Sequence, residues 1–247
     1  MSKVLAYIPL HYGAEYLDAA IRAVSPCVDQ ILILYTSRPS YGHSSGEDCP
    51  ETQEQLRDIA YNASDKIYWM DVTGMAGHEA QHRSISETFA QGKGFDQILA
   101  VDSDEVWDTV ALKRALIEAA KLPNRRVKIS GWVHFWRSFN WANQDGFLPV
   151  RICNLNNENT KEEGCVEGKI YHFGYAQSPE IIAYKLGCHG HKNELRPNWL
   201  NEKFLKWQPG IEDVHPTSIG LWNPFQFDKT TLPEVLKDHV NYNKELI

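Results

Sequence analysis

The chain has 247 residues, 43% of them hydrophobic and 23% charged, and its formal net charge is −7. This composition excludes a disordered chain, and the acidic balance excludes a uniformly basic surface, so any contact with nucleic acid requires a local patch. Five cysteines without a Cys-x-x-Cys pair, no apolar run near the ~20 residues of a membrane span, and no signal peptide before the first strand together predict a cytoplasmic protein with reduced thiols.

The first 120 residues alternate between short apolar runs and stretches with helical periodicity. The predicted strands are 3–9, 30–35, 66–71 and 98–101, and the predicted helices are 14–24, 51–61, 79–91 and 109–121. Such alternation predicts a parallel sheet with right-handed crossovers, which binds ligands at the carboxyl ends of its strands. No GxGxxG or GxxxxGK[ST] motif follows any strand, so the phosphates of a nucleotide must be met in another way.

After Pro123 the pattern changes. The predicted elements are strands at 126–135, 146–154 and 169–175 and a helix at 178–189, with an irregular segment rich in Trp and Pro from Asn198 onward. We therefore predict an α/β fold with a mostly parallel sheet flanked by helices and an irregular, Trp-rich C-terminal half. The expected organisation is a single domain over 1–247, with a nucleotide-binding half at 1–122 and an acceptor-side half with a C-terminal extension at 123–247.

The apolar run Ile98–Val101 ends in the acidic residues Asp102, Asp104 and Glu105. Carboxylates at the carboxyl end of a parallel strand lie where ligands bind, and their hard oxygens suit Mg²⁺ or Mn²⁺ shared with substrate phosphates. The alternative is that these acids cap the helix that follows, because acidic residues favour helix N-termini.

Three stretches of this sequence resemble the GT-A glycosyltransferases, especially their family-two-like branch. Asp102-Ser103-Asp104 is similar to the Asp-x-Asp signature of that fold. Glu79–Arg83 resembles the start of the helix that precedes the signature, although Ser84 stands where the family has an asparagine. His172–Glu180, followed by Lys185, resembles a His-Tyr…Ser-x-Glu…Lys stretch found late in several relatives. The likeness runs from about residue 3 to 190.

This resemblance implies a metal-dependent transferase that moves a sugar from a nucleoside diphosphate, with a UDP-sugar as the expected donor. Mn²⁺ or Mg²⁺ on Asp102 and Asp104 would neutralise the leaving diphosphate, and a late histidine would complete the metal shell. His172 is the first candidate for that histidine and His215 is its rival; the alternative for His172 is a core histidine that donates to the backbone. The implied acceptor is a glycan, a lipid, a protein or a modified nucleobase.

The expected donor contacts follow from the resemblance and the topology. Base and ribose would meet the ends of the first three strands, and Arg83 would face the diphosphate, unless it is simply a solvated helix cation. Asp102 would touch either ribose or metal. The full set of expected donor-binding residues is Pro9, His11, Glu15, Tyr35, Asp71, Arg83 and Asp102.

An inverting transferase also needs a base for the acceptor's proton. Glu212-Asp213 resembles the Glu-Asp pair that supplies this base in inverting relatives, and Glu167 is a second candidate.

Two other functions fit parts of the sequence. His78-Glu79-Ala80-Gln81-His82 matches the H-E-x-x-H pattern of zinc metallopeptidases, although its neighbours are polar and no third histidine follows at the usual spacing. The other alternative is a catalytically inactive module that binds a nucleotide sugar.

Overall fold

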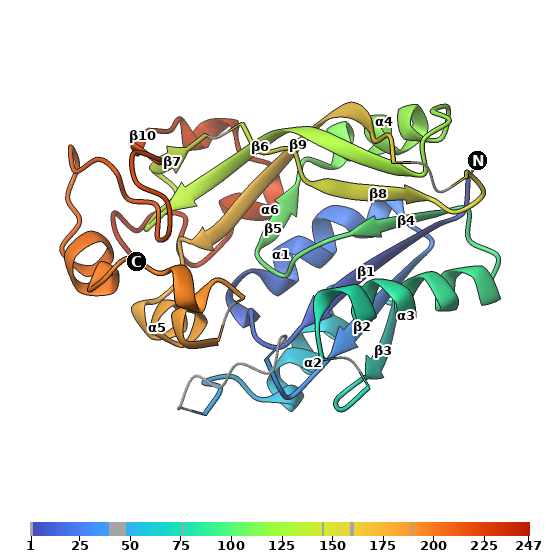
Figure 1. Cartoon of the computed structure of the whole chain (residues 1–247), viewed down its shortest axis with the longest axis horizontal. Helices are drawn as coiled ribbons and strands as arrows, with labels where there is room; N and C mark the ends of the chain where they lie inside the picture. Colours follow the sequence, from blue (N-terminus) through green and yellow to red (C-terminus); the bar gives the residue numbers. More distant parts are fainter. Residues whose placement is uncertain (1, 40–47, 76, 145, 159–160, 189) are drawn as a thin grey trace.

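The computed structural model describes residues 2–39, 48–75, 77–144, 146–158, 161–188 and 190–247. Within them, ten strands form one sheet, whose main path runs β10-β7-β6-β8-β4-β1-β2-β3 with β9 pairing β5 and β6 (Figure 1). The strands are β1 (Val4–Leu10), β2 (Gln30–Tyr35), β3 (Ile67–Asp71), β4 (Gln97–Ala100), β5 (Glu105–Trp107), β6 (Arg126–Trp136), β7 (Trp141–Asn143), β8 (Val150–Asn154), β9 (Gly164–Tyr175) and β10 (Phe225–Gln226).

Six α-helices accompany the strands in the described residues: α1 (Ala14–Val24), α2 (Gln53–Ala63), α3 (Glu79–Gly92), α4 (Thr109–Ala119), α5 (Pro179–Cys188) and α6 (Glu234–Lys237). β1 is parallel to both β2 and β4, and β2 is parallel to β3. The carboxyl ends of these four strands therefore meet at one edge of the sheet, where the predicted site lies.

Successive residues of β1 face two different cores because side chains alternate along a strand. Ala6 and Ile8 pack in the larger core with residues of α1, α2 and α4, whereas Leu5 and Tyr7 pack in a second core with residues of α3. Helices thus cover both faces of the parallel half, which explains why its strands are continuous apolar runs (Figure 1).

The C-terminal half is organised by the long parallel pair β6–β9, to which β5 is added antiparallel on the other edge of β9. This pairing sets Glu105 opposite His172 and joins the Phe173 amide to the Asp104 carbonyl at 2.8 Å. The turn after β4 is therefore held against a strand that lies some 70 residues further along the chain.

The segment after α5 contains few regular elements. A third core, formed by aromatic residues, holds it together: Trp136 packs there with Trp199, Trp207 and Trp222, all less than 9% exposed. Beyond it, residues 200–205 form a short π-helix. The predicted fold class is confirmed, namely a mixed α/β structure with a mostly parallel sheet flanked by helices and an irregular, Trp-rich C-terminal half.

Several predicted boundaries are wrong. Asp104 and Glu105 do not cap α4, because Glu105–Trp107 is strand β5 and the cap is Asp108, whose carboxylate accepts from the Ala111 amide at 2.8 Å. β8 begins at Val150 rather than Gly146, consistent with Pro149, which has no amide hydrogen to donate to a ladder.

At two other places the predicted bounds shift along the chain. β9 begins at Gly164, five residues before the predicted start. α5 ends at Cys188, and His189, where the sequence placed the helix end, lies outside the described residues. In the described part of the chain, no helix is long and apolar enough to cross a membrane.

Candidate active site

A hollow of about 260 Å³ opens at the carboxyl ends of the parallel strands, and we call it the strand-end pocket. It is lined by Pro9, Leu10, His11, Tyr12, Thr36, His82, Asp102, Ser103, Asp104, His172 and Lys185. These residues come from the end of β1 and the loop after it, from the loops after β2 and β4, and from α3, β9 and α5. The pocket therefore lies where open α/β sheets bind their ligands.

The acidic turn is fixed against the loop that follows β1. Ser103 Oγ donates to the Tyr12 carbonyl at 3.2 Å, and the Glu105 amide donates to the Asp102 carbonyl at 3.0 Å. Gly13 has φ +128°, and a Cβ there would stand 2.2 Å from Ser103 Oγ. Glycine at this position is what allows the two loops to approach so closely.

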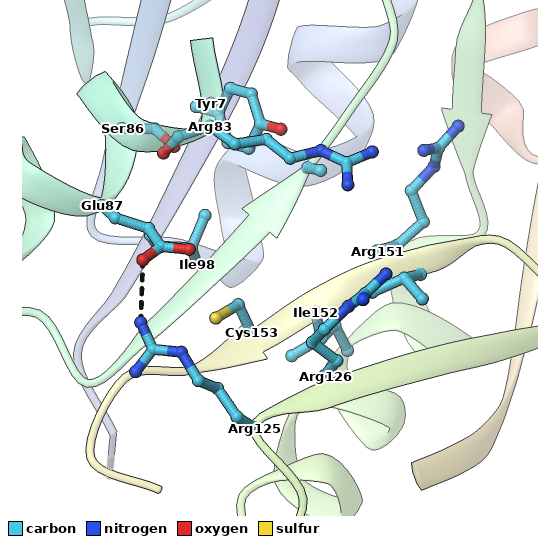
Figure 2. A pocket seen from close by; sticks show the side chains of 12 residues that line it. Tyr7, Arg83, Ser86, Glu87, Ile98, Arg125, Arg126, Arg151, Ile152 and Cys153 are labelled. Atoms are coloured by element: carbon cyan, nitrogen blue, oxygen red, sulfur yellow. Dashed lines mark hydrogen bonds and ion pairs between the residues drawn. The ribbon is translucent and has the colours of Figure 1, made fainter. Parts of the chain in front are cut away.

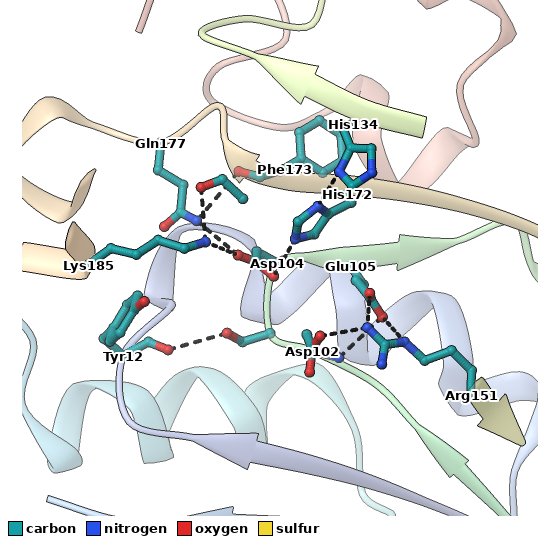
Figure 3. A network of polar contacts seen from close by, with 12 residues as sticks. Tyr12, Asp102, Asp104, Glu105, His134, Arg151, His172, Phe173, Gln177 and Lys185 are labelled. Carbon is teal, nitrogen blue, oxygen red and sulfur yellow. Dashed lines mark hydrogen bonds and ion pairs between the residues drawn. The ribbon is translucent and has the colours of Figure 1, made fainter. Parts of the chain in front are cut away.

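Asp104 carries the strongest electrostatic interactions of the pocket. Its side chain accepts from Lys185 Nζ at 3.2 Å and from Gln177 Nε2 at 3.2 Å, and its other oxygen is 3.5 Å from His172 Nε2 (Figure 3). Burial disfavours the charged carboxylate, yet Lys185 and His172 together hold the pKa of Asp104 well below its usual range. Asp104 is therefore an anion over the whole physiological pH range.

His172 is oriented by a second histidine. Its Nδ1 is 2.9 Å from Nδ1 of His134, and such a contact needs one proton between the two nitrogens. If His172 supplies that proton and is neutral, its Nε2 presents a lone pair to the Asp104 carboxylate, and only a cation between them makes that contact favourable. If His134 supplies it, His172 donates to Asp104 through Nε2–H.

Asp102 has a different cationic partner. Arg151 Nη2 donates to Asp102 at 2.7 Å, and the same guanidinium forms two contacts with Glu105 (Figure 3). Glu105 is fully buried, and burial raises its pKa to about 7 although Arg151 favours the ionised form. Arg151 thus ties the first aspartate of the turn to the floor of the site.

His82 lines the pocket from the first turn of α3, is 2% exposed, and has no hydrogen-bond partner among the described residues at either ring nitrogen. Burial lowers the pKa of this histidine, so it is neutral. A buried polar group without a partner costs about 1–3 kcal/mol. A bound ligand that hydrogen-bonds to the His82 ring would remove this cost.

Of the expected donor-binding residues, Pro9, His11 and Asp102 line the strand-end pocket. His11 is fixed by Thr36 O at 2.8 Å and Tyr184 Oη at 2.7 Å.

The other four expected donor residues, Glu15, Tyr35, Asp71 and Arg83, do not line this pocket. Glu15 accepts from the Ser178 amide, Asp71 accepts from the Thr73 amide, and Arg83 pairs with Glu79.

The candidate bases lie elsewhere. Asp213 forms a bidentate pair with Arg196, whose hydrogen bonds lower the pKa of this carboxyl. Glu212 and Glu167 are not in the strand-end pocket either, so each assignment as a base stays a prediction. His215 accepts from the Thr217 and Ser218 amides and also lies outside the pocket.

Among the described residues, no group of three or more His, Cys, Asp and Glu side chains is placed to hold a metal ion. Asp104 and His172 nevertheless offer two suitable atoms, a carboxylate oxygen and an imidazole nitrogen 3.5 Å apart, with His134 as the outer partner of the ring. This donor set fits a divalent ion that takes its remaining ligands from substrate and water.

The H-E-x-x-H residues do not form a zinc site. His78 precedes α3 with extended backbone (φ −157°, ψ 166°), so it does not share a helical face with His82. Two histidines one turn apart on a continuous helix are what that motif requires.

Sequence reasoning assigned no role to Lys185, Gln177, Arg151 or His82 in the transferase site. Arg151 stands in no motif, and Gln177 lies within the His172–Glu180 stretch without a role of its own. Arg151 comes close to the acidic turn through the pairing of β8 with β4, and Gln177 through the turn that follows β9. Lys185 and His82 each stood within a quoted motif, but nothing in the sequence tied either to Asp104 or to the pocket.

No family profile matches the chain, and no curated protein sequence matches it. Solved structures are similar to parts of it. Glucosyl-3-phosphoglycerate synthase from Mycobacterium tuberculosis, in complex with Mn²⁺, UDP and phosphoglyceric acid, is 12% identical over 55% of this chain and 44% of its own, with a TM-score of 0.37. S. aureus TarS 1-349 is 12% identical over 70% of this chain and 60% of its own, with a TM-score of 0.44. The matched parts span less than two thirds of either structure.

Proposed function

We propose that the chain is a glycosyltransferase with a GT-A-like fold that moves a sugar from a nucleoside diphosphate, with a UDP-sugar as the first donor to test. The observation that carries the proposal is the strand-end pocket, where an Asp-x-Asp turn meets a largely enclosed lysine and three histidines at the ends of parallel strands. This combination of fixed anions, a cation and an unpartnered imidazole supports recognition of a nucleoside diphosphate.

The donor's nucleoside would occupy the side of the pocket formed by Pro9, His11 and Thr36, with His82 as a hydrogen-bond partner. Its diphosphate would lie over the acidic turn. The Lys185 ammonium would stabilise negative charge there, because its ion pair with Asp104 holds it in place and it needs no reorganisation as the leaving group forms.

Asp104 and His172 would hold Mn²⁺ or Mg²⁺, with Asp102 close by for the ribose or a metal-bound water. The ion would supply positive charge against the departing diphosphate. His134 fixes the ring of His172, and Arg151 fixes the carboxylate of Asp102, so both groups are oriented before substrate binds. His215 is the reserve candidate for the metal.

The transfer is proposed to invert the anomeric centre, with Asp213, Glu212 or Glu167 as the base that takes the acceptor's proton. These three carboxylates lie outside the strand-end pocket. The acceptor hydroxyl would therefore have to bind between the pocket and the base, or a loop would have to close to bring the base to the pocket.

The test measures donor binding and turnover separately. We expect UDP to bind more tightly with Mn²⁺ than without it in calorimetric titrations, and UDP-sugar hydrolysis to require the metal. Asp104→Asn should lower the metal-dependent affinity by at least about 10-fold, because the metal loses a charged ligand. Asp58→Asn, an exposed aspartate on α2, is the matched control and should change nothing.

Binding of UDP by the wild type without turnover of any donor would favour an inactive binding module instead. Absence of any nucleotide binding, with or without metal, would contradict the proposal. His172→Gln distinguishes a metal ligand from a packing residue. If His172 binds the metal, UDP binding by the variant should lose its dependence on Mn²⁺ while the melting temperature stays close to that of the wild type.

A further inference from the structure

Two further hollows, of about 290 and 840 Å³, lie next to the strand-end pocket on the other side of the acidic turn. They adjoin each other, because Arg83, Arg126 and Arg151 line both, and residues of β6 and β8 contribute to both. Asp102 lines both the larger hollow and the strand-end pocket. We call these two hollows together the arginine groove.

The groove gathers positive charge in an acidic protein. Arg83 comes from α3, Arg126 from β6 and Arg151 from β8, so three elements distant in sequence direct arginines to one place (Figure 2). Lys128 of β6 adds a fourth cation to the larger hollow. A chain with net charge −7 has no general excess of cations to expose. This local concentration is therefore a feature of the groove itself.

Apart from Arg151, whose partners include the buried Glu105, these cations have counter-ions that are at least partly accessible to solvent. Glu163 pairs with both Arg126, at 3.0 Å, and Lys128, at 2.8 Å, and Glu79 pairs with Arg83. One carboxylate shared by two cations leaves a surplus of positive charge at that point. Exposed pairs contribute at most about 1 kcal/mol, so a phosphate can replace Glu163 on the guanidinium at low cost.

An aromatic wall stands beside these cations. The rings of Trp132 and Phe147 are 5.5 Å apart, Phe147 is 60% exposed, and the Arg151 guanidinium lies over Trp132 at 5.7 Å. Flat rings next to phosphate-binding cations form a surface for a ligand that has both an anionic group and a ring or apolar part.

We propose that the arginine groove binds the acceptor and that this acceptor carries phosphate. The proposal rests on the glycosyltransferase function above. Arg126 and Lys128 hold the phosphate, Trp132 and Phe147 contact the adjoining ring or chain, and the acceptor hydroxyl extends past Asp102 to the donor. The hydroxyl oxygen bonds to the anomeric carbon, the bond from that carbon to the diphosphate breaks with its electron pair on the diphosphate, and the hydroxyl proton passes to the base.

Two probes distinguish the sources of phosphate. Glycerol 3-phosphate represents a small phosphorylated metabolite, and the oligonucleotide (dT)8 represents a phosphodiester polymer. Each is titrated calorimetrically into the full chain, with and without saturating UDP and Mn²⁺, so that occupation of the strand-end pocket is separated from binding in the groove. Variants are Arg126→Gln/Lys128→Gln and, as a matched control, Arg22→Gln, which removes an arginine from an exposed ion pair on α1.

We expect one probe to bind the UDP-saturated protein and to bind the double variant about 10-fold more weakly, with UDP affinity unchanged. If (dT)8 is that probe, the slope of log affinity against log salt should shrink by about 1.4 for the two lost cations. The Arg22→Gln control should match the wild type.

The proposal is overturned if neither probe binds, or if the double variant binds both as the wild type does. Because UDP binding is measured in the same samples, failure of the groove is distinguishable from failure of the proposed donor site. A probe that binds only when UDP is absent has entered the strand-end pocket and also counts against the groove.

Discussion

Two aspartates separated by one residue have different surroundings in this site. Asp102 is half-exposed and pairs with Arg151, whereas Asp104 is buried and pairs with Lys185. Because a carboxylate's chemistry depends on the groups around it, the two have different proposed roles. Asp104 is the permanent anion that would hold the metal, and Asp102 is the more exposed group, near the ribose or a metal-bound water.

His82 provides a residue-scale prediction. His82→Leu removes a buried imidazole that has no described partner, so we expect the melting temperature to stay level or rise while UDP affinity falls about 10-fold. Thermal unfolding and calorimetric titration measure the two effects. His78→Asn, at an exposed position just before α3, serves as control. Unchanged UDP affinity in His82→Leu would remove His82 from the donor site.

At the scale of elements, the close approach of the paired strands β6 and β9 depends on glycine. Gly131 has φ +88°, and a Cβ there would lie 2.3 Å from the Gly168 carbonyl oxygen. An L-residue is disfavoured by the backbone conformation and also by the lack of space, so the two strands could not keep their present separation. His134 and His172 lie further along this same pair, opposite one another.

We therefore expect Gly131→Ala to lower the free energy of unfolding by about 2–4 kcal/mol, the sum of left-handed strain and overpacking. Urea denaturation measures the loss. Gly92→Ala at the end of α3 is the matched control: nothing lies within 4 Å of the added methyl group, and we expect a change of no more than about 1 kcal/mol, in the stabilising direction. Equal effects of the two substitutions would contradict the proposed need for glycine between β6 and β9.

At the scale of the whole molecule, the C-terminal segment closes over α1. His239 stacks on Tyr16 with centroids 4.6 Å apart, donates through Nε2 to the Glu15 carbonyl at 2.8 Å, and accepts at Nδ1 from the Asn241 amide. Both nitrogens are satisfied only in the neutral ring. Burial, the largest cause, lowers the pKa of His239 below its usual 6.5.

This contact predicts a pH dependence. A lowered histidine pKa means that the unfolded state binds the extra proton first, so the stabilisation is complete above pH 6.5 and is lost as the pH falls toward the folded-state pKa. Wild type should therefore lose stability on acidification faster than His239→Gln, by at most about 1.4 kcal/mol per pH unit. Urea midpoints at several pH values measure the difference, and parallel curves would show that His239 makes no contribution.

The sequence alone predicted the four parallel strands and the four helices of the first 120 residues and the position of the acidic turn. Apolar runs and helical periodicity are local signals, and in this half each helix packs on strands close to it in sequence. β5 was missed because a buried three-residue strand in an acidic context has no period to detect. Its existence depends on β9, which is far along the chain.

Only the tertiary structure decided what surrounds that turn. Lys185 reaches Asp104 across 81 positions, Arg151 reaches Asp102 across 49, and His134 meets His172 across 38. Local patterns carry no information on such pairings, because the packing of the whole sheet sets both the strand register and which distant segments become neighbours. The sequence determined where anions would stand at the strand ends; the long-range packing determined which cations and histidines face them, because those contacts exist only once distant segments share one core.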